Sequence, residues 1–293
     1  VREPRINTIT FSLPVDKDIV LRNGTVHLKD SARIVNQLIW RMPNENIYQV
    51  NGNDTVMVVS KAYIAMMDIL ANNNWERPIY YVSTTGSESF FGLDKYFQVE
   101  GLAYRLVPVE PYTTEQRGFF YGSVNTDILY NNIIKKFNFS EFSNPNIYLS
   151  EDYTRTVQNL KIFLFRLAES LVLENDLARA DEVMEKYYSW FPQQTIPYDF
   201  LDFYMAETYI KFANKEGITK GINIYNDYVD QLNIETEYYL KFRGKHTEIV
   251  SNNLNRNRSI LNQIANNSSH YASTYTDFAE KFNSLSEKAR IHL

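Results

Sequence analysis

Residues 71–85 read ANNNWERPIYYVSTT, and this stretch predicts the joint between a helix and a strand. Asn72–Asn74 follow a run of apolar residues at helical spacing, and asparagine tolerates the left-handed conformation in which many helices end. Pro78 cannot continue a helix and keeps Arg77 extended. The next residues, IYYVS at 79–83, have too little polarity for a half-exposed strand, so we expect a central strand of a sheet.

Upstream of the joint, the sequence predicts several short elements. Ser60 can cap the helix that ends at the asparagines. One face of that helix carries Tyr63, Met66, Met67 and Leu70, at i, i+3, i+4 and i+7. SARIVNQLIWRM (31–42) has similar spacing and predicts another helix, and Asn23-Gly24 between IVLR and TVHL predicts a hairpin. RINTITFSL (5–13) alternates like a half-buried strand.

Downstream of the joint, the pattern changes from mixed to helical. LDKYF (93–97) predicts a helical turn, and GLAYRLVPV (101–109) predicts a second apolar strand that prolines end. We therefore expect a mixed α+β or α/β domain over residues 1–125 and an all-α domain over residues 126–293.

The helical part has the spacing of a tetratricopeptide repeat. The pattern places large and small residues on two successive helices before a proline, and it is met by Leu164, Leu167, Ala168, Leu171, Ala180, Met184, Tyr187 and Pro192. Gly221, Tyr225 and Tyr228 keep the spacing of the second helix in a looser copy. A generic helical hairpin has the same patterning, so both interpretations stay open.

The composition excludes several classes of protein. The chain has 293 residues, 44% of them hydrophobic, which is ample for a core. Its net charge of −5 and lack of a basic stripe argue against a nucleic-acid partner. It has no cysteine, and therefore no disulfide, thiolate metal site or cysteine nucleophile. The chain begins at Val1 rather than Met, so we expect it to be a piece of a longer protein.

No catalytic constellation stands out, and we expect no catalytic residue, no metal site and no cofactor in this chain. The four histidines have no partner at i+3 or i+4, and there is no glycine-rich phosphate loop. Asp16-Lys17-Asp18 has the carboxylate spacing with which nucleotide-sugar transferases hold a divalent ion. Since the motif is short and lies in a polar stretch beside Pro14, a solvated turn is the favoured alternative.

Three blocks occur in order: NNWERPIYY (73–81), GLDKY (92–96) and EGLAYRLVP (100–108). With these blocks the chain resembles the soluble C-terminal part of a bacterial family of multi-spanning membrane proteins of unknown function. The membrane part of that family is similar to glycosyltransferases that use polyprenyl-phosphate sugars, including protein O-mannosyltransferases. The resemblance covers about residues 56–110. It implies a periplasmic domain tethered to the inner membrane, with the preceding membrane domain as its partner, and it carries over no catalytic residue.

Two sets of residues are candidates for function. The candidate binding residues are Trp75, Arg77, Glu100, Tyr104 and Arg105. Trp75 also fits a plug over the helix–strand joint, and Arg77 could tie the loop to a carboxylate such as Glu76 or Glu100. Ser31 and Thr55 lie in short Asp-Ser/Thr-apolar triplets, which resemble acceptors of periplasmic O-glycosylation.

Three functions are consistent with these observations. The leading hypothesis is a non-catalytic extracytoplasmic accessory domain that binds an acceptor protein, a glycan or a partner subunit. The second is a carbohydrate-active enzyme, for which the Asp-x-Asp motif and the abundant aromatics speak. The third is a cytoplasmic scaffold of the tetratricopeptide type.

Overall fold

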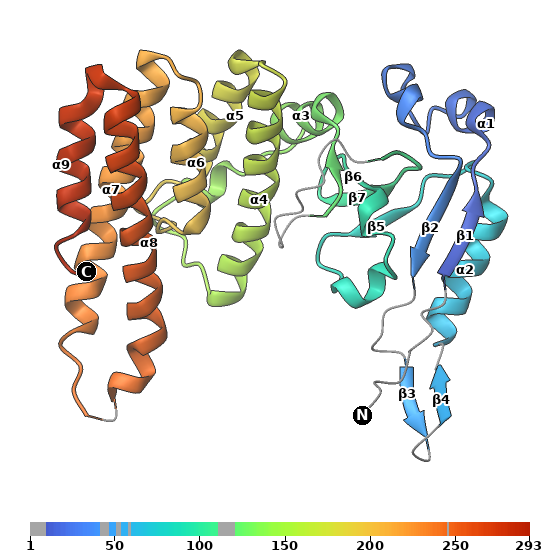
Figure 1. The fold of residues 1–293 in the computed structure, drawn as a ribbon, viewed down its shortest axis with the longest axis horizontal. Helices are drawn as coiled ribbons and strands as arrows, with labels where there is room; N and C mark the ends of the chain where they lie inside the picture. Colours follow the sequence, from blue (N-terminus) through green and yellow to red (C-terminus); the bar gives the residue numbers. More distant parts are fainter. Residues whose placement is uncertain (1–9, 42–46, 51–53, 58–59, 111–120, 245) are drawn as a thin grey trace. The chain divides into compact units, whose positions relative to one another are not determined.

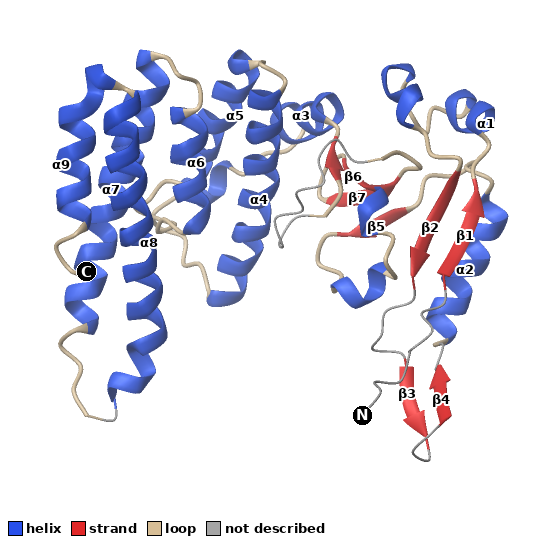
Figure 2. Ribbon diagram, viewed as in Figure 1, coloured by secondary structure: helices blue, strands red, loops and turns tan. Residues whose placement is uncertain are grey.

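A computed structural model describes residues 10–41, 47–50, 54–57, 60–110, 121–244 and 246–293. The chain divides into two compact units, Val1–Lys136 and Phe137–Leu293. The first unit mixes strands and helices, whereas the second is helical (Figures 1 and 2). This confirms the predicted order of an α+β part followed by an all-α part. The boundary between the two compact units lies after Lys136, whereas the sequence pattern predicts a boundary near residue 125.

The strands of the first unit form three small sheets. Two sheets are antiparallel pairs, β1 (Thr10–Pro14) with β2 (Gln37–Arg41) and β3 (Ile47–Val50) with β4 (Asp54–Met57). The third has four strands in the order β5-β7-β6-β8, in which only β6 and β8 run parallel. Its strands are β5 (Tyr80–Val82), β6 (Phe97–Val99), β7 (Ala103–Leu106) and β8 (Ser123–Val124).

The helices of the first unit are mostly short. They are α1 (Lys17–Arg22), α2 (Lys61–Asn73), α3 (Thr126–Lys135) and the 3-10 helices η1 (Leu28–Arg33), η3 (Ser87–Phe90) and η4 (Asp94–Tyr96). The predicted start of α2 is confirmed, because the Ser60 hydroxyl accepts a hydrogen bond from the Tyr63 N–H. The predicted end of α2 is also confirmed, because the backbone of Asn74 has the left-handed conformation, with φ 45°. Tyr63 and Leu70 are buried on the predicted face.

Two predictions near the start of the chain are wrong. Asn23-Gly24 does not join two strands, because the preceding residues form α1. The carboxylate of Asp16 caps this helix by accepting hydrogen bonds from the N–H groups of Asp18 and Ile19. Residues 37–41 form β2 and not part of a helix. Leu38 and Trp40 alternate with exposed neighbours, and pairing with β1 outweighs the helical spacing.

The strand after the helix–strand joint is an edge strand and not the predicted central one. β5 pairs with β7 on one side and ends the order of the four-stranded sheet. Tyr80 is 49% exposed and Val82 58% exposed. Aromatic and β-branched residues favour strands on a pleated, half-buried surface, so an apolar run of this length does not by itself require a central position. The predicted turn at 93–97 and the strand within 101–109 are confirmed as η4 and β7.

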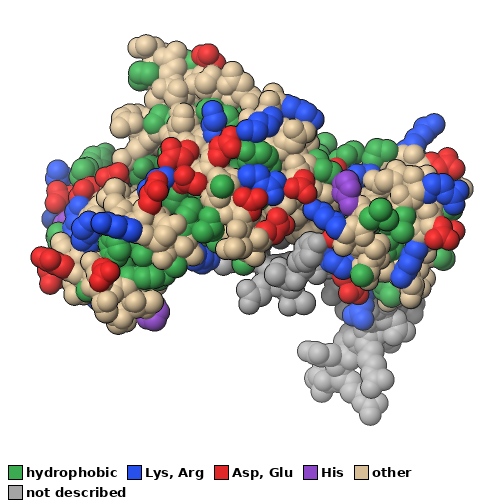
Figure 3. Space-filling model, turned by 90° about the horizontal axis from the view of Figure 1, so that it is seen from above, with side chains coloured by type: hydrophobic (Ala, Val, Ile, Leu, Met, Phe, Trp, Pro, Cys, Tyr) green, Lys and Arg blue, Asp and Glu red, His purple; other side chains and the backbone are tan. Residues whose placement is uncertain are grey.

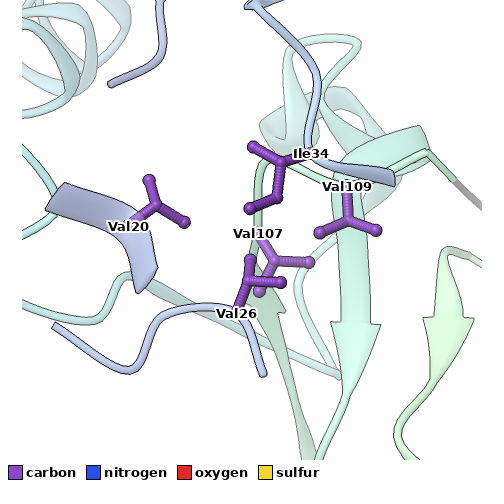
Figure 4. Packing of buried hydrophobic residues seen from close by; sticks show 5 residues of the cluster. All are labelled: Val20, Val26, Ile34, Val107 and Val109. Atoms are coloured by element: carbon purple, nitrogen blue, oxygen red, sulfur yellow. The ribbon is translucent and has the colours of Figure 1, made fainter. Parts of the chain in front are cut away.

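The core of the first unit contains an aliphatic and an aromatic cluster. The aliphatic cluster brings together side chains from α1 and from three connecting segments, namely Val20, Val26, Ile34, Val107 and Val109 (Figure 4). The aromatic cluster includes Phe90, Phe97, Tyr104 and Tyr121. Gly92 has φ +75°, and a β-carbon there would lie 2.9 Å from the Arg41 carbonyl oxygen. Only glycine fits this position without displacing the backbone of β2.

The second unit is built from three helical hairpins. Their helices are α4 (Glu151–Leu173), α5 (Leu177–Trp190), α6 (Phe200–Ile210), α7 (Lys215–Tyr239), α8 (His246–Thr274) and α9 (Ala279–Ala289), with short 3-10 helices η5 (Ser140–Ser143) and η6 (Thr276–Phe278). The pairs α4/α5, α6/α7 and α8/α9 pack side by side (Figure 1). All seven helical positions of the tetratricopeptide pattern are fully buried in α4 and α5. The hairpin is thus shown, while its assignment to that repeat family stays a prediction.

The small residue of the looser copy, Gly221, lies where two helices approach each other. A β-carbon on Gly221 of α7 would lie 2.6 Å from Ile210 and 2.8 Å from the Ala206 carbonyl oxygen of α6. The two helices approach closely because this side chain is absent.

No helix in the described ranges combines the length and apolar composition that a membrane span needs. On the face that Figure 3 shows, acidic and basic side chains are interspersed rather than separated by sign.

Candidate functional site

Glu100 and Arg105, two of the predicted binding residues, form a largely buried ion pair in the first unit. Glu100 follows β6, and Arg105 lies in β7. Arg105 Nη1 lies 3.2 Å from Glu100 Oε1, and the two side chains are 14% and 7% exposed. Tyr80 of β5 donates a hydrogen bond to Glu100 Oε2 over 3.1 Å. Both carboxylate oxygens are thus occupied, which makes this an anchored charge rather than a free acid.

Sheet register explains why these side chains meet. Arg105 is the cross-strand partner of Tyr80 on one side and of Gln98 on the other, so the three residues share one face of the sheet. Burial is the main cause that raises the pKa of Tyr80, and the charge of Glu100 raises it further. The phenol therefore stays a hydrogen-bond donor at neutral pH. Arg105 Nε is buried without a partner among the described residues.

The other three predicted binding residues are not members of this ion pair, although Tyr104 is next to Arg105 in β7. Trp75 is half-buried against the aliphatic cluster of Figure 4, and its carbonyl oxygen accepts a hydrogen bond from the Asn23 side chain. Tyr104 is buried and stacks on Phe97, with ring centroids 5.5 Å apart. Arg77 is exposed, and Glu100 pairs with Arg105 instead of with it. A binding role for these residues stays a prediction.

The structure describes the side-chain surroundings of Ser31, one of the two candidate glycosylation residues, but not those of Thr55. Ser31 is half-buried in η1, beside Asp30, whose carboxylate pairs with Arg33 at 3.0 Å. Thr55 lies in β4, and its side chain is outside the described part of the structure. Modification of either residue stays a prediction.

A cavity of about 570 Å³ opens in the first unit, and none of its lining was predicted as a site. Its walls come from the start of η1 and from α3. The lining residues are His27, Leu28, Lys29, Asp127, Ile128, Asn131, Asn132 and Lys136. Lys29 Nζ and Asp127 Oδ2 lie 2.8 Å apart and join the two walls. The sequence gives no signal for this cavity, because the two walls are almost one hundred residues apart in the chain.

The second unit holds a buried charge cluster that links α4 to α6. Lys161 Nζ lies 2.8 Å from Asp202 Oδ2 and 3.0 Å from Asp199 Oδ2. Tyr187 donates a hydrogen bond to Asp202 Oδ1 over 3.1 Å. Although burial lowers the pKa of Lys161, the charges of Asp202 and Asp199 outweigh that effect and raise it. Lys161 and Asp202 are each 1% exposed, so no substrate reaches them, and the cluster fixes one hairpin against the next.

Asp199 and Asp202 also form the cap of α6. The Asp199 N–H donates a hydrogen bond to Asp202 Oδ2, while the Asp199 side chain accepts one from the Leu201 N–H. The helix end is thereby tied to the lysine of α4. In the described ranges, no group of three histidine or acidic side chains is arranged to hold a metal ion.

The sequence is similar to one known family. Residues 4–128 match the family TMEM260-associated domain 2. The matched range includes all three sequence blocks, the Glu100–Arg105 pair and the first wall of the cavity. The helical unit lies outside it. None of the curated proteins and none of the solved structures matches the chain.

Proposed function

We propose that this chain is a non-catalytic extracytoplasmic accessory domain of a multi-pass membrane protein related to glycosyltransferases that use lipid-linked sugars. The observation that carries the proposal is the match of residues 4–128 to a domain associated with TMEM260. In this proposal the preceding membrane domain of the same protein is the partner of the first unit, and the helical unit binds an acceptor protein, a glycan or a partner subunit.

The two buried charge clusters support an accessory role. In the first unit Arg105 and Tyr80 occupy the carboxylate of Glu100, and in the second Lys161 and Tyr187 occupy that of Asp202. A catalytic acid or base has to reach a substrate, whereas these carboxylates are held by protein groups on both oxygens. They stabilise the fold and position the surfaces around them.

The stacked hairpins support a binding role for the second unit. Each hairpin buries one side against the next, as α4 does against α6 and α7 against α8. Such stacks leave an extended surface that other repeat proteins use for binding. This supports the tetratricopeptide-like interpretation without requiring a catalytic residue in the helices.

The carbohydrate-active enzyme is the alternative. Most glycoside hydrolases use two carboxylates that face each other across the scissile bond. The lining of the described cavity offers one carboxylate, Asp127, and Lys29 is already paired with it. The Asp-x-Asp motif does not supply the second, since Asp16 caps α1 and neither Asp16 nor Asp18 lines the cavity.

The test is an assay of purified residues 1–293 with nucleotide-linked sugars, lipid-linked sugars and glycosides. We expect no hydrolysis and no transfer above the rate in buffer. The proposal would be contradicted by turnover that Asp127→Asn abolishes and Asp277→Asn leaves unchanged. Asp277 is an exposed carboxylate of the helical unit and serves as the matched control.

A further inference from the structure

The cavity between η1 and α3 has the size and the polar groups of a small-ligand site. Its volume of about 570 Å³ falls in the range of roughly 300–1,000 Å³ that is usual for such sites. Seven of the eight lining residues belong to two segments of the chain, 27–29 and 127–132. The eighth is Lys136, which directly follows α3. All of them belong to the first unit.

One wall of the cavity is held in place by Asn132. Its side-chain amide donates a hydrogen bond to the Glu100 carbonyl oxygen over 2.5 Å. Its side-chain oxygen accepts one from Lys136 Nζ over 2.8 Å. The ammonium group of Lys136 is therefore positioned at the cavity before any ligand arrives, with two further N–H donors available.

The charge of the lining favours an anion. Lys29 and Asp127 neutralise each other in a pair that is more than half exposed, which leaves Lys136 as an excess positive charge. His27 is exposed at the same cavity, and its imidazole can donate a hydrogen bond to an anion.

The remaining lining groups suit hydroxyl groups and a small apolar face. Asn131 is exposed, and its amide makes no hydrogen bond to the described residues. Leu28, which is 80% exposed, and Ile128 supply apolar contacts.

We propose that this cavity binds a small hydroxylated anion, of the class of sugar phosphates and sugar acids. The anionic group lies at Lys136 and His27, and the hydroxyl groups bond to Asn131. The inference concerns the first unit alone and does not depend on where the protein is located or on what the helical unit binds.

The test is titration of purified residues 1–293, followed by the backbone amide NMR signals of residues 127–136. The probes are glucose 6-phosphate, glucuronate, glucose and inorganic phosphate. We expect both hydroxylated anions to shift these signals in a saturable manner. Lys136→Gln removes one charge-assisted hydrogen bond to the anionic group. This variant should bind glucose 6-phosphate and glucuronate on the order of tenfold more weakly.

The matched control is Lys135→Gln on the same helix. Lys135 is exposed, lies outside the cavity lining and has its Nζ 5.1 Å from the centre of the Tyr130 ring. We expect binding by this variant to change by less than about twofold, because Lys135 does not line the cavity and its charge is screened by salt. Unchanged thermal unfolding of both variants would show that the fold is intact.

Each other outcome contradicts the inference. Glucose that binds as tightly as glucose 6-phosphate would remove the need for an anion. Phosphate that binds as tightly would show a plain anion site with no use for the hydroxyl groups. Equal weakening by both lysine variants, or no saturable shift with any probe, would show that this cavity is not the site.

Discussion

The side-chain amide of Asn132 in α3 donates a hydrogen bond to the backbone carbonyl oxygen of Glu100 over 2.5 Å. The carboxylate of the same glutamate holds Arg105 and Tyr80. Asn132 also accepts a hydrogen bond from Lys136 at the cavity. Asn132 thus contacts both Glu100, a member of the buried ion pair, and Lys136, which lines the cavity. We therefore expect a substitution in the ion pair to change the position of the cavity wall.

Glu100→Gln should destabilise the first unit by about 3–5 kcal/mol, because it leaves the buried guanidinium of Arg105 without its counter-charge. Tyr80→Phe removes one hydrogen bond at a half-exposed residue and should cost about 1 kcal/mol. Urea unfolding of both variants in a Trp190→Phe background, which leaves Trp40 and Trp75 of the first unit as the two tryptophans, measures the two losses by fluorescence. A cost for Glu100→Gln no larger than that of Tyr80→Phe would show that the ion pair is unimportant for stability.

Lys161→Met should destabilise the helical unit by about 3–5 kcal/mol, since it leaves Asp202 as a buried charge without its cation. The control is Lys220→Met. Lys220 is half-buried, but the three carboxylates that it contacts, Asp181, Glu185 and Glu216, are 38%, 60% and 77% exposed. Pairs with exposed partners contribute little, about 0–1 kcal/mol, so we expect a smaller loss here. The two variants are compared by thermal unfolding. Equal losses would contradict the assignment of Lys161 as the residue that fixes α4 against α6.

Tyr187 and Tyr188 are adjacent tyrosines whose hydroxyl groups are both buried, and their variants should have opposite effects. The Tyr187 hydroxyl bonds to Asp202, so Tyr187→Phe should lower the free energy of unfolding by roughly 1–2 kcal/mol. The Tyr188 hydroxyl is buried and has no partner among the described residues. Because an unsatisfied buried hydroxyl costs about 1–3 kcal/mol, Tyr188→Phe should raise stability at neutral pH. A loss in Tyr188→Phe equal to that in Tyr187→Phe would contradict this difference.

Both tyrosines should also make the fold sensitive to alkali. Burial, assisted by the charge of Asp202, raises the pKa of each phenol well above its ordinary value of 10.0. The unfolded chain loses these protons first as the pH rises. The contribution of the neutral phenols is therefore complete below about pH 10 and is lost as the pH rises from there through the raised pKa values. Above pH 10, stability should fall less steeply in Tyr188→Phe than in the wild type, and parallel curves would refute the linkage.

Gly92→Ala should cost more stability than Gly24→Ala. Both glycines have positive φ, at +75° and +66°, so both substitutions carry the strain of a left-handed residue, of about 1 kcal/mol. Only at Gly92 would the new β-carbon lie 2.9 Å from a backbone oxygen, that of Arg41, whereas nothing lies within 4 Å at Gly24. The difference between the two melting temperatures measures this close approach. Equal melting temperatures would show that β2 moves freely away from Gly92.

Local patterns predicted the helical parts better than the strands. Ser60, Asn74 and the buried positions of α4 and α5 follow from spacing and capping, which act within a few residues. The errors at residues 31–42 and 79–83 arose where tertiary pairing decides the outcome. β2 needs β1 as a partner, and whether β5 is central depends on which strand lies beyond it.

The candidate sites show the same limit. The continuous block EGLAYRLVP indicates Glu100 and Arg105, but their partner Tyr80 depends on strand register. The cavity joins Lys29 to Asp127 across 98 residues, a distance that no local spacing reveals. The cluster of Lys161, Asp199 and Asp202 required the packing of α4 against α6.

The most direct test of the proposed location uses the absence of cysteine from this chain. A cysteine introduced at the exposed Glu248 of α8 gives the 293 residues one reactive thiol. It is probed in the full-length protein, in spheroplasts of the native host, with a membrane-impermeant maleimide. The unsubstituted protein provides the background. Labelling of Glu248→Cys before lysis is the predicted result and would place the domain outside the cytoplasm. Labelling only after lysis would contradict the accessory-domain proposal and leave a cytoplasmic scaffold as the better account.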